Sequence, residues 1–248
     1  MFQAWRLQLQ EARVALRGGS LDEAGQLLQQ NDLLRFRPAK DLSAKLAEKY
    51  LERAEDRVGR GESSAGWRDL QLATDLASAS PRVGEVRQRL IERSLAEARR
   101  YLEAHQPDEA LARLERLSQR NASSDESRRL CQAALQWKRA IRLGQRGHFA
   151  EAEIEWASAA ALADDVAAFA QQLEACRLKK IEAARCTQQL HRALVAEDWS
   201  TVLEATDKLL ELAPDHPQAR SAKCRAWAAV GVRETRLTPG TPLSRAKR

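Results

Sequence analysis

The stretch GQRGHFAEAEIEWASAA, residues 144–160, decides the fold. It opens on glycines, which commonly end helices, and continues with apolar residues that recur every three or four positions. The residues that carry this pattern are Gly147, Phe149, Ala152, Trp156 and Ala159. Small residues at this spacing let two helices approach closely, and large ones fill the groove beside them. The stretch therefore predicts a turn followed by a helix that packs tightly against a neighbour.

The same helical spacing extends over most of the chain. No segment alternates with the period of two that marks a strand. Short breaks rich in Gly, Ser and Asp divide the helices into pairs, and they fall at residues 17–21, 59–67, 105–109, 145–149 and 196–199. A second set of breaks separates one pair from the next, at residues 35–41, 78–82, 120–126, 162–165 and 213–218. Because short connections favour antiparallel neighbours, we expect an all-α chain of five helix hairpins and a terminal helix near 217–230.

The five spaced residues of the opening stretch resemble the second half of a tetratricopeptide repeat. That family places Gly before the turn, then an aromatic residue, Ala, a second aromatic residue and a second Ala at offsets of two, three, four and three. Less faithful copies begin at Gly18, Gly66, Gln106 and Trp199. The resemblance implies a right-handed solenoid of about five antiparallel helix hairpins with a terminal capping helix, in a repeat domain over residues 1–231.

The repeats are longer than those of the family. Taking Ala24, Leu70, Ala110, Ala152 and Val202 as equivalent positions gives spacings of 46, 40, 42 and 50 residues, against about 34 in a regular array. The alternative is a generic helical bundle or a long coiled coil. Aromatic residues that recur at the turns argue against a plain coiled coil.

Composition excludes several classes of protein. The 248 residues are 44% hydrophobic and 31% charged, so the chain can bury a core. It contains no run of 18 apolar residues, and we expect no transmembrane segment. Its four cysteines form no C-x-x-C pair, and its four histidines do not cluster with them at metal-ligand spacing. We therefore expect reduced, buried thiols, a cytoplasmic protein, no metal site and no cofactor.

Signals of catalysis are absent from the sequence. No phosphate-binding or dinucleotide-binding glycine loop occurs, and neither does H-E-x-x-H or G-x-S-x-G. The carboxylates stand three or four residues from basic side chains, as in surface helix pairs. We therefore expect a protein that is not an enzyme.

The resemblance implies a binding surface, because in the family the first helix of each pair lines a concave groove that takes peptides. The implied partner-binding residues are Arg6, Leu9, Arg13, Arg17, Arg99, Trp137, Ile141 and His191. The arginines at positions 6, 13 and 17 fall within about 40° on a helical wheel. Guanidinium groups bind carboxylates with paired hydrogen bonds, so this face suits an acidic or C-terminal carboxylate peptide. The alternative is a solvated helix face whose alkyl stems cover apolar surface.

A second basic surface lies between residues 127 and 150, a stretch without any acidic residue. Four of its arginines fall within about 60° on a helical wheel, namely Arg128, Arg139, Arg142 and Arg146. This alternative patch for an anionic ligand suits an acidic protein, RNA or an anionic membrane surface. The other interpretation is that its charges pair across helices with Glu151, Glu153 and Glu155.

The last 17 residues, 232–248, contain five basic residues, one acidic residue and two Thr-Pro steps. They indicate a basic, disordered tail or linker. Taken together, these features favour an adaptor or scaffold that binds a partner protein without chemistry. The alternatives are a nucleic-acid or anionic-surface binder and a regulatory module of a longer multidomain protein.

Overall fold

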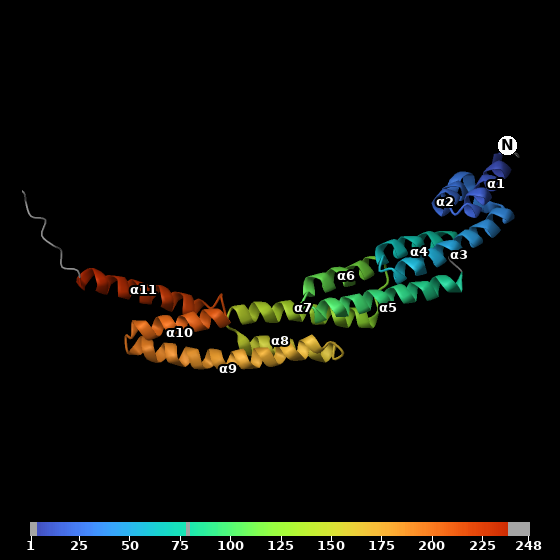
Figure 1. Cartoon of the computed structure of the whole chain (residues 1–248). Helices are drawn as coiled ribbons and strands as arrows, with labels where there is room; N and C mark the ends of the chain where they lie inside the picture. Colours follow the sequence, from blue (N-terminus) through green and yellow to red (C-terminus); the bar gives the residue numbers. More distant parts are fainter. Residues whose placement is uncertain (1–3, 78–79, 238–248) are drawn as a thin grey trace, which may run out of the picture. The chain divides into compact units, whose positions relative to one another are not determined.

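The computed structural model describes residues 4–77 and 80–237, and over these residues the chain is all-α without a strand (Figure 1). The first helices of the pairs are α1 (Ala4–Arg17), α3 (Arg37–Gly59), α5 (Pro81–Glu103), α7 (Asp125–Gln145) and α9 (Ala167–Val195). The second helices are α2 (Leu21–Gln29), α4 (Ser63–Ala77), α6 (Pro107–Gln119), α8 (Phe149–Leu162) and α10 (Trp199–Leu212). A 3-10 helix, η1 (Gln30–Arg35), follows α2, and α11 (Pro217–Leu237) follows the last pair. The expected all-α class is confirmed.

Each of the five pairs is joined by a turn of the same geometry. Three residues separate the helices, and the middle one has a left-handed backbone: Gly19, Gly61, His105, Gly147 or Glu197. The next residue donates its N–H to a carbonyl five positions back, as from His148 to Leu143 at 2.9 Å. This hydrogen bond closes a Schellman motif, which satisfies the last carbonyls of the first helix. The same turn geometry thus recurs in all five pairs, even where glycine is missing.

The turns correct the expected repeat frame in the second pair. Five residues after each left-handed position lies a buried residue, and the set is Ala24, Gly66, Ala110, Ala152 and Val202. The sequence pattern predicted Leu70 as the equivalent of Ala24, but Leu70 lies one helical turn beyond Gly66. The error arose because α4 begins at Ser63, inside the stretch taken as a break. A Cβ on Gly66 would lie 3.2 Å from the Ala54 carbonyl oxygen, so α4 approaches α3 closely there.

The chain forms two compact units. The first comprises the chain up to Glu97 together with Arg113–Ala122, and the second comprises Ala98–Ala112 together with the chain from Ser123 onward. In the first unit, α2 packs against α1 and α3, and α3 packs against α4. In the second, α8 packs against α7 and α9, and α10 packs against α9 and α11. The longest helix, α9, is therefore shared between two second helices (Figure 1).

The start of α11 packs on the turn between α7 and α8. The Asp215 N–H donates to the Gln145 carbonyl at 2.8 Å. A Cβ on Gly147 would lie only 2.4 Å from Cδ2 of His216, so the imidazole occupies the space above this glycine. His216 also caps α11, because its Nδ1 accepts the Ala219 N–H at 3.2 Å. Burial lowers the pKa of His216, and the charge of nearby His148 lowers it further.

The terminal helix is longer than expected. It runs to Leu237, seven residues past the expected end near 230 and into the segment assigned to the tail. The rest of that segment, residues 238–248, lies outside the described residues.

Candidate functional site

Four of the expected partner-binding residues meet in one groove on α1. A cavity of about 490 Å³ is lined by Arg6, Leu9, Arg13 and Arg17, together with other side chains that include Trp5 and Pro38. Leu9 is only 5% exposed and belongs to the floor, whereas the three arginines are exposed. The helical spacing of three to four residues places them along one face of α1.

Aromatic stacking holds the start of the groove. The Trp5 ring stacks on Phe36, which precedes α3, with centroids 4.7 Å apart and planes within 6°. The Arg6 guanidinium lies over the same indole at 5.4 Å from its centroid. The Trp5 N–H is buried and has no hydrogen-bond partner among the described residues. The groove thus combines an apolar floor with donors that are not in use.

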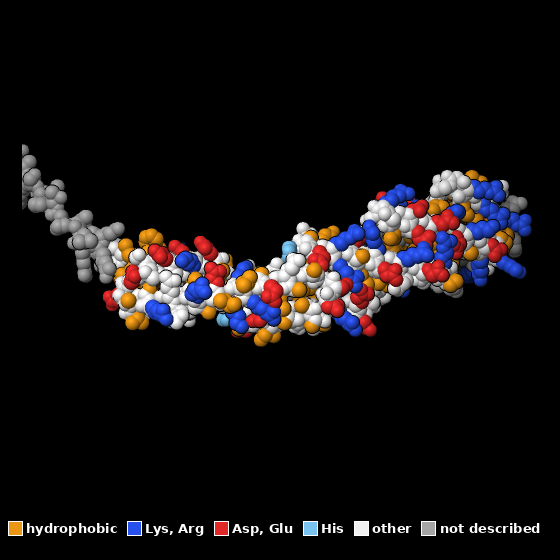
Figure 2. All heavy atoms as spheres, turned by 60° about the horizontal axis from the view of Figure 1, so that its bottom comes forward, with side chains coloured by type: hydrophobic (Ala, Val, Ile, Leu, Met, Phe, Trp, Pro, Cys, Tyr) orange, Lys and Arg blue, Asp and Glu red, His pale blue; other side chains and the backbone are white. Residues whose placement is uncertain are grey.

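The charge of the groove is uncompensated. Within residues 4–77 and 80–237, neither Arg6, Arg13 nor Arg17 forms an ion pair. In Figure 2, Lys and Arg side chains gather over α1 to α3, at the right of the view. This end of the first unit therefore favours a ligand of negative charge.

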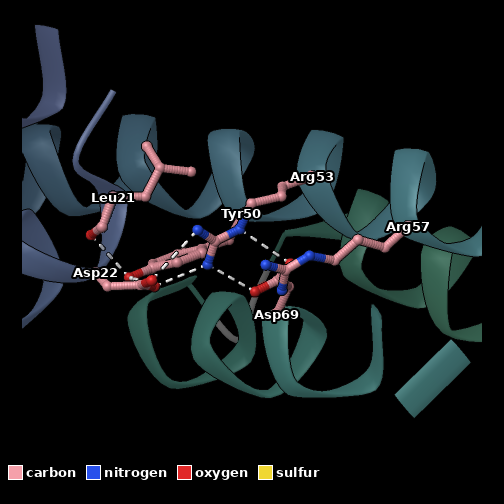
Figure 3. A network of polar contacts seen from close by, with 6 residues as sticks. All are labelled: Leu21, Asp22, Tyr50, Arg53, Arg57 and Asp69. Carbon is pink, nitrogen blue, oxygen red and sulfur yellow. Dashed lines mark hydrogen bonds and ion pairs between the residues drawn. The ribbon is translucent and has the colours of Figure 1, made fainter. Parts of the chain in front are cut away.

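A buried carboxylate fastens the helices next to the groove (Figure 3). Asp69 on α4 has a side chain that is only 1% exposed, and it bridges two arginines of α3. Its Oδ1 lies 2.7 Å from Nη2 of Arg53, and its Oδ2 lies 2.7 Å from Nη1 of Arg57. Two charge-assisted partners offset the large cost of burying a carboxylate. Asp69 stands on the apolar face of α4, and this was the signal in the sequence that we missed.

The same network reaches α2, which packs on α1. Nη2 of Arg53 donates to Oδ1 of Asp22 at 2.8 Å, and the Tyr50 hydroxyl donates to the Leu21 carbonyl at 2.8 Å (Figure 3). Burial raises the pKa of Tyr50 to about 12, so the phenol stays protonated and keeps donating. The hydrogen bond from Arg53 lowers the pKa of Asp22. Three helices, α2, α3 and α4, are thus held in register.

Two other expected partner-binding residues have structural roles. Arg99 pairs with Glu126 and, at 2.5 Å, with Asp165, so it ties α5 to the start of α7 and the start of α9. Trp137 is 2% exposed and packs edge-on against Trp156, with centroids 5.0 Å apart. Neither side chain presents a free surface to a partner.

The last two expected residues line separate cavities of the second unit. Ile141 is 40% exposed at a cavity of about 300 Å³ between α7, α8 and α9. His191 lines a cavity of about 550 Å³ with Phe149, Arg192 and His216. Neither residue is among those that line the α1 groove.

The arginines on the basic face of α7 do not pair with the glutamates of α8, as the alternative interpretation of this face expected. Glu153 pairs instead with Arg177 and Lys180 of α9, at 3.0 and 2.9 Å. Within residues 4–77 and 80–237, Glu155 forms no ion pair, and Glu151 approaches only His148, with 3.7 Å between its Oε1 and Nδ1 of the imidazole. The expected pairing of α7 with these three glutamates is therefore wrong, because Glu153 faces α9 and no described glutamate of α8 pairs with an arginine of α7.

The four arginines of that face differ in their contacts. Arg128 pairs with Asp125 in its own first turn, and Nε of Arg142 donates to the Lys138 carbonyl at 3.4 Å. Arg139 and Arg146 are exposed and form no ion pair within the described part of the chain. The basic face is thus only partly occupied.

Three other features of the described residues concern metal binding, membrane crossing and cysteine chemistry. No group of three or more His, Cys, Asp or Glu side chains in residues 4–77 and 80–237 is placed to hold a metal ion. No described helix is long and apolar enough to cross a membrane. None of the four cysteines forms a disulfide; Cys176 and Cys186 are buried, Cys131 is partly exposed and Cys224 is exposed.

Comparison with known proteins finds no relative of this chain. Protein-family models, curated proteins and solved structures were each searched, and none matched the chain.

Proposed function

We propose that this chain is a non-catalytic adaptor or scaffold that binds an acidic peptide or helix of a partner protein in the α1 groove. The observation that carries the proposal is the convergence of three exposed, unpaired guanidinium groups on an apolar floor. Carboxylates bind guanidinium groups through two parallel hydrogen bonds, and apolar side chains of the same peptide bury against the floor.

The proposal includes a tetratricopeptide-like helical-repeat solenoid as the scaffold. Its support is the turn geometry that recurs in all five pairs and the buried residue that follows each turn, which is Ala or Gly in four of the five pairs. Stacked hairpins present the first helix of each pair as a rigid surface, which lowers the entropy lost on binding. Four cysteines without a disulfide favour a cytoplasmic setting for this function.

The test is a selection of random peptides displayed on phage against the full chain, followed by titration of the selected peptides. We expect sequences in which Asp or Glu alternates with apolar residues. Arg13→Gln and Arg17→Gln should each weaken binding about three- to tenfold, since each removes a charge-assisted hydrogen bond. Arg60→Gln, an exposed position at the end of α3 away from the groove, is the matched control.

Two results contradict this function. One is a set of selected peptides without acidic residues. The other is an equal loss of affinity in Arg13→Gln and Arg60→Gln, which would mean that only the net charge of the protein matters.

A second candidate function is binding of a nucleic acid or an anionic surface by α7. It is favoured by the exposed and unpaired state of Arg139 and Arg146. A single-stranded RNA probe separates the two functions, because each phosphate contact adds about 0.7 to the slope of log affinity against log salt concentration. The double variant Arg139→Gln, Arg146→Gln should reduce that slope by about 1.4. A slope near zero removes this candidate.

A further inference from the structure

A second cavity with unmatched positive charge lies in the first unit, away from the α1 groove. It has a volume of about 320 Å³ and is formed by α4, α5 and the end of α6. Three arginines line it: Arg68 of α4, Arg87 of α5 and Arg120, which directly follows α6. Amide side chains of Gln71 and Asn121 complete its polar wall.

No carboxylate compensates the three arginines. None of them forms an ion pair among the described residues, and no Asp or Glu lines the cavity. Asp75, one turn further along α4 from Gln71, accepts a hydrogen bond from that amide at 2.8 Å and stays outside the lining. Burial lowers the pKa of Arg120, and the charges of Arg116 and Arg113 lower it further. The cavity therefore gathers three positive charges, and that of Arg120 is partly desolvated, which is costly without an anion.

The side chain of Arg120 is held in place by its neighbours. Its guanidinium lies over the Trp67 ring, 5.2 Å from the centroid, and Trp67 is only 6% exposed. The backbone around it is closed by the Ala122 N–H, which donates to the Leu117 carbonyl at 3.0 Å, and by Asn121 with φ of 51°. The Trp67 indole N–H is itself buried without a hydrogen-bond partner in the described part. A stacked cation is thus fixed at one wall of the cavity.

We propose that this cavity binds a phosphate dianion carried as a phosphate monoester. Three guanidinium groups and two amides offer more donors than the two oxygens of a carboxylate can accept, whereas a phosphate monoester offers three strong acceptor oxygens and nearly two charges. Arginine forks match the geometry of phosphate oxygens. The volume of about 320 Å³ exceeds the needs of a bare phosphate, and it leaves room for the group that the ester carries.

Isothermal titration of the full chain at pH 7.5 and constant ionic strength tests the proposal. The probes are inorganic phosphate, N-acetyl-O-phosphoserine amide and adenosine monophosphate, with sodium chloride as the ionic-strength control. We expect binding of phosphate at one site and tighter binding of one ester, which identifies whether the phosphate comes from a modified protein or from a nucleotide.

Variants distinguish a specific binding site from nonspecific electrostatic attraction. Arg87→Gln and Arg120→Gln should each weaken binding about five- to tenfold, and Arg120→Lys should lose less, because it keeps the charge without the fork. Arg87 is exposed, so its variant folds whatever Arg120 contributes to stability. Arg60→Gln removes the same charge at an exposed position of the first unit outside the cavity and should bind as the parent does. Absence of phosphate binding above the chloride control, or equal losses in Arg60→Gln and Arg87→Gln, overturns the proposal.

Discussion

At the scale of single residues, Gly147 shows how the end of one helix is used by another. Its φ is +84°, which disfavours a side chain, and the His216 ring fills the space that a Cβ would need. Gly19 has the same backbone, with φ of +81°, but nothing lies within 4 Å of its Cβ position. Substitution of these two glycines therefore distinguishes the cost of backbone strain from the cost of steric contact.

We expect Gly19→Ala to lower the free energy of unfolding by about 1 kcal/mol through left-handed strain alone. Gly147→Ala should lose more, because the new methyl group must also displace His216. Urea denaturation followed by circular dichroism measures both. Equal losses would mean that His216 moves away without cost.

Ala152 illustrates the small residue that follows each turn. It is fully buried where α8 packs on its neighbours, so Ala152→Leu should destabilise the chain by about 1–3 kcal/mol through overpacking. Ala150→Leu, an exposed position on the same helix, is the control. A neutral effect of Ala152→Leu, measured by the same denaturation, would show that this position is not a close helix contact.

At the scale of elements, the Asp69 network fixes α4 against α3. Asp69→Asn leaves two partly buried guanidinium groups without their carboxylate and should destabilise by about 3–5 kcal/mol. Asp22→Asn removes a partner of Arg53 whose side chain is 68% exposed, and it should cost at most about 1 kcal/mol. Thermal unfolding of the pair of variants compares them directly, and similar losses would contradict a special role for the buried carboxylate.

The junction of α11 with the α7–α8 turn should depend on pH. The pKa of His216 lies below its ordinary value of 6.5 in the folded chain. As pH falls below 6.5, the unfolded chain takes up a proton that the folded chain accepts only at lower pH, so the free energy of unfolding falls through this window. Protonation also removes the Nδ1 lone pair that caps α11 and places a positive charge at a helix N-terminus.

His216→Asn keeps a capping side chain but does not titrate. It should flatten the decline in stability between pH 7 and pH 5, whereas His191→Asn, at an exposed position, should leave that decline as it is. Denaturation at a series of pH values checks the sign, and an unchanged decline in His216→Asn would assign it to other groups.

At the scale of the whole molecule, α5 and α6 each contribute residues to both compact units. A helix continuous across two units transmits the loss of order in one to the other, as neighbouring repeats do in helical arrays. We therefore expect one calorimetric transition that shifts with both Asp69→Asn in the first unit and Ala152→Leu in the second. Two peaks, each sensitive to only one of these variants, would show that the units unfold independently.

Much of this architecture could be predicted because its signals are local. Glycines and polar residues at the turns, and apolar residues at helical spacing, mark the five hairpins without knowledge of the neighbours. Leu70 was taken as the repeat position in place of Gly66 because three glycines lie close together, at positions 59, 61 and 66. The sequence did not show which of them held the left-handed turn. The turns at His105 and Glu197 show why glycine alone is an incomplete marker.

The candidate site could be predicted only in part. The arginines of α1 share one helix, so their common face follows from a spacing of 3.6 residues per turn. The sequence by itself thus determined the helix pairs and the α1 stripe, since both depend on residues close together in the chain. Tertiary structure decided which charges are satisfied, because pairs such as Arg99 with Asp165 join residues far apart in sequence, and burial removed Trp137 from the surface. It also brought Arg68 of α4, Arg87 of α5 and Arg120 of the turn after α6 to one cavity, which no local pattern records.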